Sequence, residues 1–130
     1  MIYLDSSVAI AELLAEDRRP PAGLWDDDLI SSRLFEYEVW VRLHARGLGE
    51  INAEPARQLV RRVSLLELSP VVLVRALEPF PRSLRTLDAL HIASMAHLRD
   101  NGERVALASY DRRMTTVAET MGFPLYDLGN

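Results

Sequence analysis

Two side chains that often carry chemistry are missing from this sequence: it has no cysteine and no lysine, and all 15 basic residues are arginine. Without a thiol, the chain has no cysteine nucleophile, thiolate zinc site, iron–sulfur cluster or disulfide. Without lysine, it has no Schiff base, no pyridoxal phosphate anchor and no phosphate-binding P-loop lysine. The chemistry that remains is that of carboxylates, hydroxyls, arginines and three histidines.

Long hydrophobic runs are also lacking, and the N-terminal residues do not show the pattern of a leader segment. The longest uncharged stretches fall far short of the roughly 20 apolar residues that a membrane helix needs. The N-terminus has no basic start, and Asp5, Glu12 and Glu16 interrupt its apolar pattern. We therefore expect a soluble, cytoplasmic protein with no membrane partner.

A positive net charge is absent as well. The chain carries 19 carboxylates against its arginines, for a formal net charge of −4 at pH 7. Broad, nonspecific binding of duplex DNA normally needs a basic surface, so this balance argues against it.

Short apolar runs alternate with helical patterns along the chain. Its 130 residues suit a single domain, residues 1–130. Strands are expected at residues 2–4, 28–31, 65–68, 104–108 and 123–128. Helices are expected at about 6–16, 32–47, 53–63, 70–77, 86–100 and 111–121. Short strands separated by helices are typical of βαβ units, so the pattern predicts an α/β domain whose parallel sheet is covered on both faces.

Two carboxylates stand directly after expected strands. Ligands of open α/β sheets bind beyond the carboxyl ends of the strands. Asp5 ends the first strand and Asp111 follows the fourth. Either acid alone can be an ordinary helix N-cap, but two acids at neighbouring strand ends are suggestive of a site.

The helix expected at 32–47 offers two glutamates, and its periodicity does not decide between them. Glu38 lies within about 60° of an apolar stripe that includes Leu34 and Val41. A carboxylate beside such a stripe is costly unless it is paired or bound to metal. Glu36 lies on a second apolar side of the helix, so one side is expected to face the core and the other is a candidate contact with a partner chain.

Asp88 has the most informative sequence context. It stands near the start of an apolar helix, on the face that carries Ile92 and Met95, so it points toward the core side. An acid in a first helical turn also complements the helix dipole. His91 follows one turn later, where a hydrogen-bonded structural histidine is more common than a metal ligand.

Two arginines precede Asp88 and two follow Asp111: Arg82, Arg85, Arg112 and Arg113. They can be ordinary surface charges or ion pairs, or a rim of guanidinium groups suited to phosphate oxygens. The acidic run at residues 26–28 is interpreted as a solvated loop without chemistry.

Four segments together resemble the PIN-domain ribonucleases, specifically the VapC-like toxins of bacterial toxin–antitoxin pairs. Their sequences are IYLDSS at 2–7, SRLFEYEV at 32–39, LRTLDALHIA at 84–93 and ASYD at 108–111. They occur in the family's order over nearly the whole chain, and LDALHIA is the most specific of them.

The resemblance implies a three-layer α/β/α sandwich with a mainly parallel sheet of four to five short strands. It also implies that the protein cleaves RNA. It selects Glu38 through the register SxLxxxE and implies a catalytic quartet that binds Mg²⁺, with Mn²⁺ as a substitute: Asp5, Glu38, Asp88 and Asp111. A cation in such a site generates hydroxide from bound water for in-line attack on phosphorus. Because the ribose 2′-hydroxyl is not the nucleophile, a 5′-phosphate and a 3′-hydroxyl are expected.

The resemblance also implies supporting residues and partners. Ser109 stands where the family often has threonine, and Ser6 directly follows the first acid. The implied partners are an RNA substrate, a cognate antitoxin whose segment covers the site or places an arginine in it, and a second copy of the chain. This homodimer can be part of a larger toxin–antitoxin assembly.

Other acid-based enzyme classes fit less well. Receiver domains and haloacid-dehalogenase-like phosphatases rely on a lysine, and the latter need a second aspartate where this chain has Ser7. A serine hydrolase of the nucleophile-elbow type needs Gly-x-Ser-x-Gly, which is absent. The remaining alternative is a PIN-like module that binds RNA or a protein without cutting.

Overall fold

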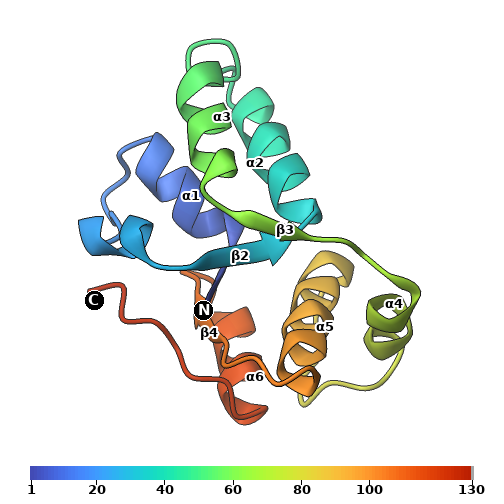
Figure 1. Cartoon of the computed structure of the whole chain (residues 1–130). Coiled ribbons are helices and arrows are strands. Elements are labelled where there is room, and N and C mark those ends of the chain that lie inside the picture. Colours follow the sequence, from blue (N-terminus) through green and yellow to red (C-terminus); the bar gives the residue numbers. More distant parts are fainter. Residues whose placement is uncertain (130) are drawn as a thin grey trace.

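A four-stranded parallel sheet forms the centre of the molecule in the computed structural model, which describes residues 1–129 (Figure 1). The strand order is β3-β2-β1-β4, and all three pairings are parallel. The strands are β1 (Ile2–Leu4), β2 (Leu29–Ser32), β3 (Ser64–Leu66) and β4 (Ala106–Ala108). The prediction of a short-stranded parallel sheet is confirmed.

Helices cover both faces of the sheet. One layer holds α1 (Ser6–Leu13), α2 (Leu34–Ala45) and α3 (Ala53–Arg61), and the other holds α5 (Thr86–Asp100) and α6 (Arg112–Thr120). A short helix, α4 (Pro70–Ala76), packs against α5 at the outside, and a 3₁₀ helix, η1 (Ala22–Asp26), precedes β2 (Figure 1). This is the α/β/α sandwich that the sequence predicted.

Neighbouring residues of the central strands divide the core into two halves. Leu4 belongs to the apolar cluster under α1, α2 and α3, whereas Tyr3 belongs to the cluster under α5 and α6. In β4, Ala108 and Leu107 divide in the same way. This follows from the alternation of side chains along a strand, and it places both clusters directly beside the strand ends that carry the acids.

The strand order creates a crevice between β1 and β4. The chain leaves β1 toward β2 on one side, while β4 pairs with the other side of β1. Such a switch of direction is where open α/β sheets bind ligands. Asp5 follows β1 here, and its N–H donates to the carbonyl of Ala108 at 3.0 Å, which continues the β1–β4 ladder to the edge of the crevice.

The strand expected at 123–128 is not formed, so that prediction was wrong. A single parallel bridge joins Leu125 to Leu107, and Tyr126 N–H donates to the carbonyl of Leu107 at 2.8 Å. The carbonyl of Pro124 accepts from Leu107 N–H, but Pro124 has no N–H to donate, which prevents a longer ladder.

The first helix is also shorter than expected, because Ala15 takes a left-handed φ of 48° two residues after Leu13.

The helix bounds at 86–100 are confirmed by α5, and Ser69 caps α4 by accepting from Val72 N–H at 3.4 Å. Ser32, the first residue of the helix expected at 32–47, instead ends β2, and its Oγ accepts from Leu34 N–H at 2.9 Å. Within residues 1–129, no helix combines the length and the apolar character that crossing a membrane requires.

Candidate active site

Asp5 is held at the end of β1 by two serine hydroxyls. The acid is 5% exposed, and its Oδ2 accepts from Ser7 Oγ at 2.6 Å and from Ser109 Oγ at 2.8 Å. Asp5 also occupies the N-cap position of α1, but its side chain makes no capping bond. The carboxylate is thus oriented by hydroxyls from both sides of the crevice and does not cap the helix.

The same hydroxyls tie down the turn that follows β4. Ser7 Oγ accepts from Tyr110 N–H and Ser109 Oγ accepts from Asp111 N–H, both at 3.0 Å. Ser109, the candidate supporting residue, thus contacts both Asp5 and the backbone of Asp111. Ser6 is placed differently: its Oγ is buried and has no hydrogen-bond partner among residues 1–129. Ser7 makes the contact instead, and the Asp-x-Ser spacing was the signal that could have revealed it.

Asp111 opens α6 as its N-cap. Its Oδ1 accepts from the backbone N–H groups of Arg113 and Met114, at 2.9 and 3.3 Å. The structural and the functional interpretations of this residue are therefore compatible, because capping uses one oxygen of the carboxylate.

Glu38 reaches the site from α2 and meets His91 of α5. Glu38 Oε1 lies 2.6 Å from His91 Nε2, and the two side chains are 11% and 0% exposed. The other ring nitrogen, Nδ1, lies 2.7 Å from the hydroxyl of Tyr3, which is also buried. Burial alone would lower the pKa of His91, but the hydrogen bond and negative charge of Glu38 outweigh it and raise the pKa.

Glu36 faces another part of the molecule. It lines a cavity of about 300 Å³ between α2 and α3 together with Arg57 and Arg61. The two glutamates, which periodicity left undecided, are thus separated by the fold. Glu38 points toward α5, the helix that bears Asp88, because it contacts His91 of that helix. His91 is thus hydrogen-bonded, as expected.

Asp88 is half-buried at the start of α5, and the other acids act on it. Burial raises the pKa of this carboxyl, and the charges of Asp111, Asp5 and Glu38 raise it further. Within the described 1–129 segment, no hydrogen bond to the Asp88 side chain is present. The negative charges of the other three candidate acids thus oppose the ionisation of Asp88.

The donor set fits a hard divalent cation. All four groups are carboxylates, and Mg²⁺ and Mn²⁺ prefer oxygen ligands. A cation would relieve the repulsion that raises the Asp88 pKa. Over residues 1–129, no three carboxylate or histidine side chains stand in a ready-made cation cage.

Three of the four candidate arginines line one cavity beside the start of α6. Arg82, Arg112 and Arg113 enclose about 560 Å³ with the hydroxyl residues Ser83 and Thr116. Arg85, at the N-cap of α5, is not among the lining residues. None of these arginines forms an ion pair with a carboxylate of residues 1–129, so their charges are available to an anion.

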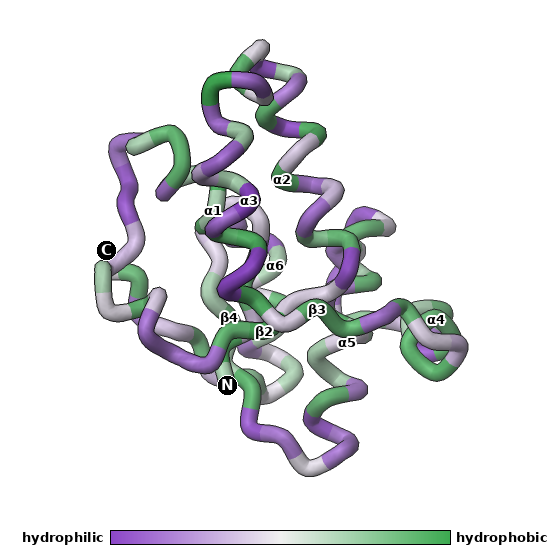
Figure 2. Tube along the Cα trace, turned by 45° about the horizontal axis from the view of Figure 1, so that its top comes forward, coloured by the Kyte–Doolittle hydropathy of each residue, from purple (hydrophilic) through white to green (hydrophobic). Residues whose placement is uncertain are grey.

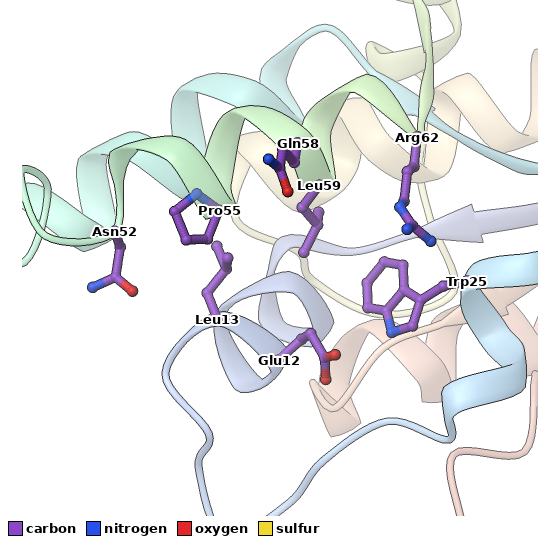
Figure 3. A pocket seen from close by; sticks show the side chains of 8 residues that line it. All are labelled: Glu12, Leu13, Trp25, Asn52, Pro55, Gln58, Leu59 and Arg62. Atoms are coloured by element: carbon purple, nitrogen blue, oxygen red, sulfur yellow. The ribbon is translucent and has the colours of Figure 1, made fainter.

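A further cavity, of about 360 Å³, lies between α1 and α3 and contains none of the quartet (Figure 3). Trp25 and Leu59 line it together with Glu12 and Arg62. Its carboxylate stands alone, so this cavity has no cluster of acids for hydrolysis. The acidic run at 26–28 is exposed, as expected of a solvated segment, but its first residue, Asp26, ends the 3₁₀ helix η1 and is not in a loop.

A family model for the PIN domain matches residues 2–120. The chain belongs to the PIN-domain family. Within this family it is similar to two proteins of Mycobacterium tuberculosis, ribonuclease VapC47 and ribonuclease VapC46. The first is 30% identical over 95% of this chain and 93% of that protein. The second is 35% identical over 93% of this chain and 92% of that protein.

A solved structure has a similar fold. The crystal structure of Mycobacterium tuberculosis VapC20, a toxin that cleaves the sarcin–ricin loop, superposes with a TM-score of 0.69 over 95% of this chain and 96% of that one. At 20% identity, this likeness concerns the fold. The resemblance to VapC-like PIN domains that the four sequence segments indicated is confirmed.

Proposed function

We propose that this protein is a metal-dependent endoribonuclease that acts as the toxin of a toxin–antitoxin pair, with residues 1–130 as one PIN domain. The observation that carries the proposal is the state of Asp88. Its half-buried carboxyl has a pKa raised by burial and by Asp111 and Asp5, at the switch point of a parallel sheet. Repulsion within a cluster of carboxylates destabilises the folded protein, whereas the same carboxylates can bind a cation.

Asp5, Glu38, Asp88 and Asp111 would hold Mg²⁺ or Mn²⁺ through carboxylate oxygen. When bound, such an ion lowers the pKa of a coordinated water and stabilises charge on a phosphoryl group. The serine hydroxyls keep Asp5 oriented during turnover, and capping keeps Asp111 fixed to α6. Attack by water and not by the ribose 2′-hydroxyl would leave a 5′-phosphate and a 3′-hydroxyl.

The arginine-lined cavity is proposed to take the phosphates of the RNA strand. Arg82, Arg112 and Arg113 present guanidinium groups that suit phosphate oxygens. Arg112 and Arg113 directly follow Asp111 in the chain, so the cavity that they line lies next to this acid. A single strand, whose backbone can bend into a cleft, suits this arrangement better than a duplex does.

The proposed protein partners are a cognate antitoxin and a second copy of the chain. The segment of α4 is largely hydrophobic (Figure 2), and Val71, Val74 and the C-cap residue Leu77 are exposed by 62%, 59% and 85%. On α2, Tyr37 and Val41 are exposed by 63% and 65%. Apolar residues gathered on an outer helix favour a protein contact over solvent, and we assign the α4 face to the homodimer.

One observation favours a second function, a PIN-like module that binds RNA or protein without cutting. The acids of residues 1–129 do not form a ready-made cation cage. The two functions differ in the effect of a cation: a nuclease gains cleavage from it, whereas a binding module has no cleavage to gain.

Incubation of the purified protein with total RNA tests the proposal. We expect cleavage that stops with a chelator and returns with Mg²⁺ or Mn²⁺, and sequencing of the new 5′ ends would identify the target. Cleavage that persists in excess chelator would refute metal dependence. RNA that is bound but left intact in every condition would favour the binding module.

The toxin assignment has its own test. We expect expression of the chain to arrest growth, and co-expression of a small protein encoded directly upstream to restore it. Growth that is unaffected by expression of an active nuclease would indicate a housekeeping enzyme.

A further inference from the structure

His91 joins two elements of the acid site through buried side chains. Its Nε2 lies 2.6 Å from Glu38 Oε1 on α2, and its Nδ1 lies 2.7 Å from the Tyr3 hydroxyl on β1. The rings of His91 and Tyr3 meet edge to face, with centroids 5.7 Å apart. Both of these side chains are fully buried, so water does not compete for either hydrogen bond.

The chemistry of the partners assigns the protons in this chain of contacts. A carboxylate can only accept, so Nε2 of His91 carries the proton and donates to Glu38. The hydroxyl of Tyr3 can then donate to the unprotonated Nδ1, which lies 2.7 Å away. Tyr3 thereby selects the ring tautomer that serves Glu38.

We propose that His91, supported by Tyr3, is a positioning residue that holds Glu38 ready for a divalent cation. This inference rests on the proposed function, because a cation site is what the oriented carboxylate would serve. The N–H of His91 engages Oε1, and within residues 1–129 no hydrogen bond engages Oε2. One oxygen is therefore fixed by the protein while the other is left for a ligand.

A glutamate without this support would bind a cation less well. Its side chain has several rotatable bonds, and ordering them on binding opposes affinity. Hydrogen bonds to ligating carboxylates remove that cost in advance, and the loss of such outer contacts typically weakens metal binding by about 10–100-fold. Asp5 and Asp111 accept hydrogen bonds from their own protein donors, and His91 supplies the corresponding donor to Glu38.

Calorimetric titration of the full chain with Mn²⁺ tests the proposal without any measurement of cleavage. We expect His91→Leu to weaken Mn²⁺ binding by about 10–100-fold. His91→Gln should bind close to the wild type, because its amide nitrogen can donate to Oε1. The matched control is His97→Leu on the same helix, where the histidine contacts Asn101 and none of the acids, and its affinity should be unchanged.

A second variant covers the case in which His91→Leu does not fold. Tyr3→Phe keeps the buried ring and removes only the hydroxyl that faces Nδ1. We expect it to fold, to bind Mn²⁺ less tightly than the wild type and to alter the ¹⁵N shifts of the His91 ring. Addition of diamagnetic Mg²⁺ should move the same ring resonances in the wild type.

The outcomes separate this inference from the proposed function. If His91→Leu and Tyr3→Phe are folded and bind Mn²⁺ as tightly as the wild type, His91 is a packing residue and the inference is wrong. Weaker Mn²⁺ binding by these variants, in a wild type that leaves RNA intact, supports the positioning role while refuting the nuclease. A wild type that binds no Mn²⁺ overturns both.

Discussion

The acid cluster and the arginine-lined cavity are neighbours at the start of α6, yet their charges are held in opposite ways. Asp5, Glu38 and Asp111 each accept hydrogen bonds from defined protein donors. The arginines of the cavity have no carboxylate partner among residues 1–129. The difference suits two tasks. Catalysis needs side chains that are already fixed in position, whereas binding the flexible RNA backbone needs side chains that can adjust to it.

The largest expected effect follows from neutralising the centre of the acid cluster. Asp88→Asn keeps the size of the side chain but removes the charge that the other acids surround, so we expect RNA cleavage to fall below detection while the fold persists. Circular dichroism of the variant is the control. Cleavage by this variant at the wild-type rate would refute the quartet assignment.

The two glutamates of α2 give a matched pair. Glu38→Gln should lose most cleavage activity, because Glu38 is the one held toward α5 by His91. Glu36→Gln should retain the wild-type rate, since Glu36 faces Arg57 and Arg61. Equal losses in the two variants would remove the distinction that the fold makes between them.

A smaller effect is expected on the arginine side. Arg112→Ala removes one phosphate contact and should raise KM more than it lowers kcat. The slope of log affinity against log salt for single-stranded RNA should fall by about 0.7. Arg85→Ala is the control, since Arg85 does not line the cavity. A kcat defect in Arg112→Ala with an unchanged salt slope would place this arginine in the chemistry instead.

The smallest effect on catalysis is expected from the outer face of α4. Leu77→Glu places a charge where an 85% exposed leucine now lies, so it should shift the protein from dimer to monomer in light scattering at low micromolar concentration. The melting temperature of the variant is the control for folding. It should be nearly unchanged, because a surface substitution changes stability by only about 0.5 kcal/mol. A variant that stays dimeric would move the interface elsewhere, with Tyr37 and Val41 on α2 as the next candidates.

The sequence predicted the parts of this protein that depend on local pattern. The helix at 86–100 and the acids after the first and fourth strands follow from periodicity and position. The prediction of a strand at 123–128 was wrong because it relied on apolar character alone. A strand also needs backbone N–H donors, and Pro124 has none.

The contacts within the site depend on tertiary packing that periodicity does not contain. Glu38 and His91 are 53 residues apart, and Tyr3 and His91 are 88 apart. No pattern of spacing along the chain relates residues on α2, α5 and β1, so the choice between Glu36 and Glu38 needed either the family register or the fold. The contact of Ser7 with Asp5 could not be inferred either, because a hydroxyl near a helix start most often caps the helix.

The central claim is that the four carboxylates form one cation site, and the melting temperature across Mg²⁺ concentrations tests it most directly. The raised pKa of Asp88 means that the folded state carries its ionised form at a cost that the unfolded chain does not have. Without cation, Asp88→Asn should therefore melt above the wild type. As Mg²⁺ is added, the wild type should gain stability and the variant should not, so the two curves should cross. Parallel curves, or a wild type that does not respond to Mg²⁺, would contradict the claim.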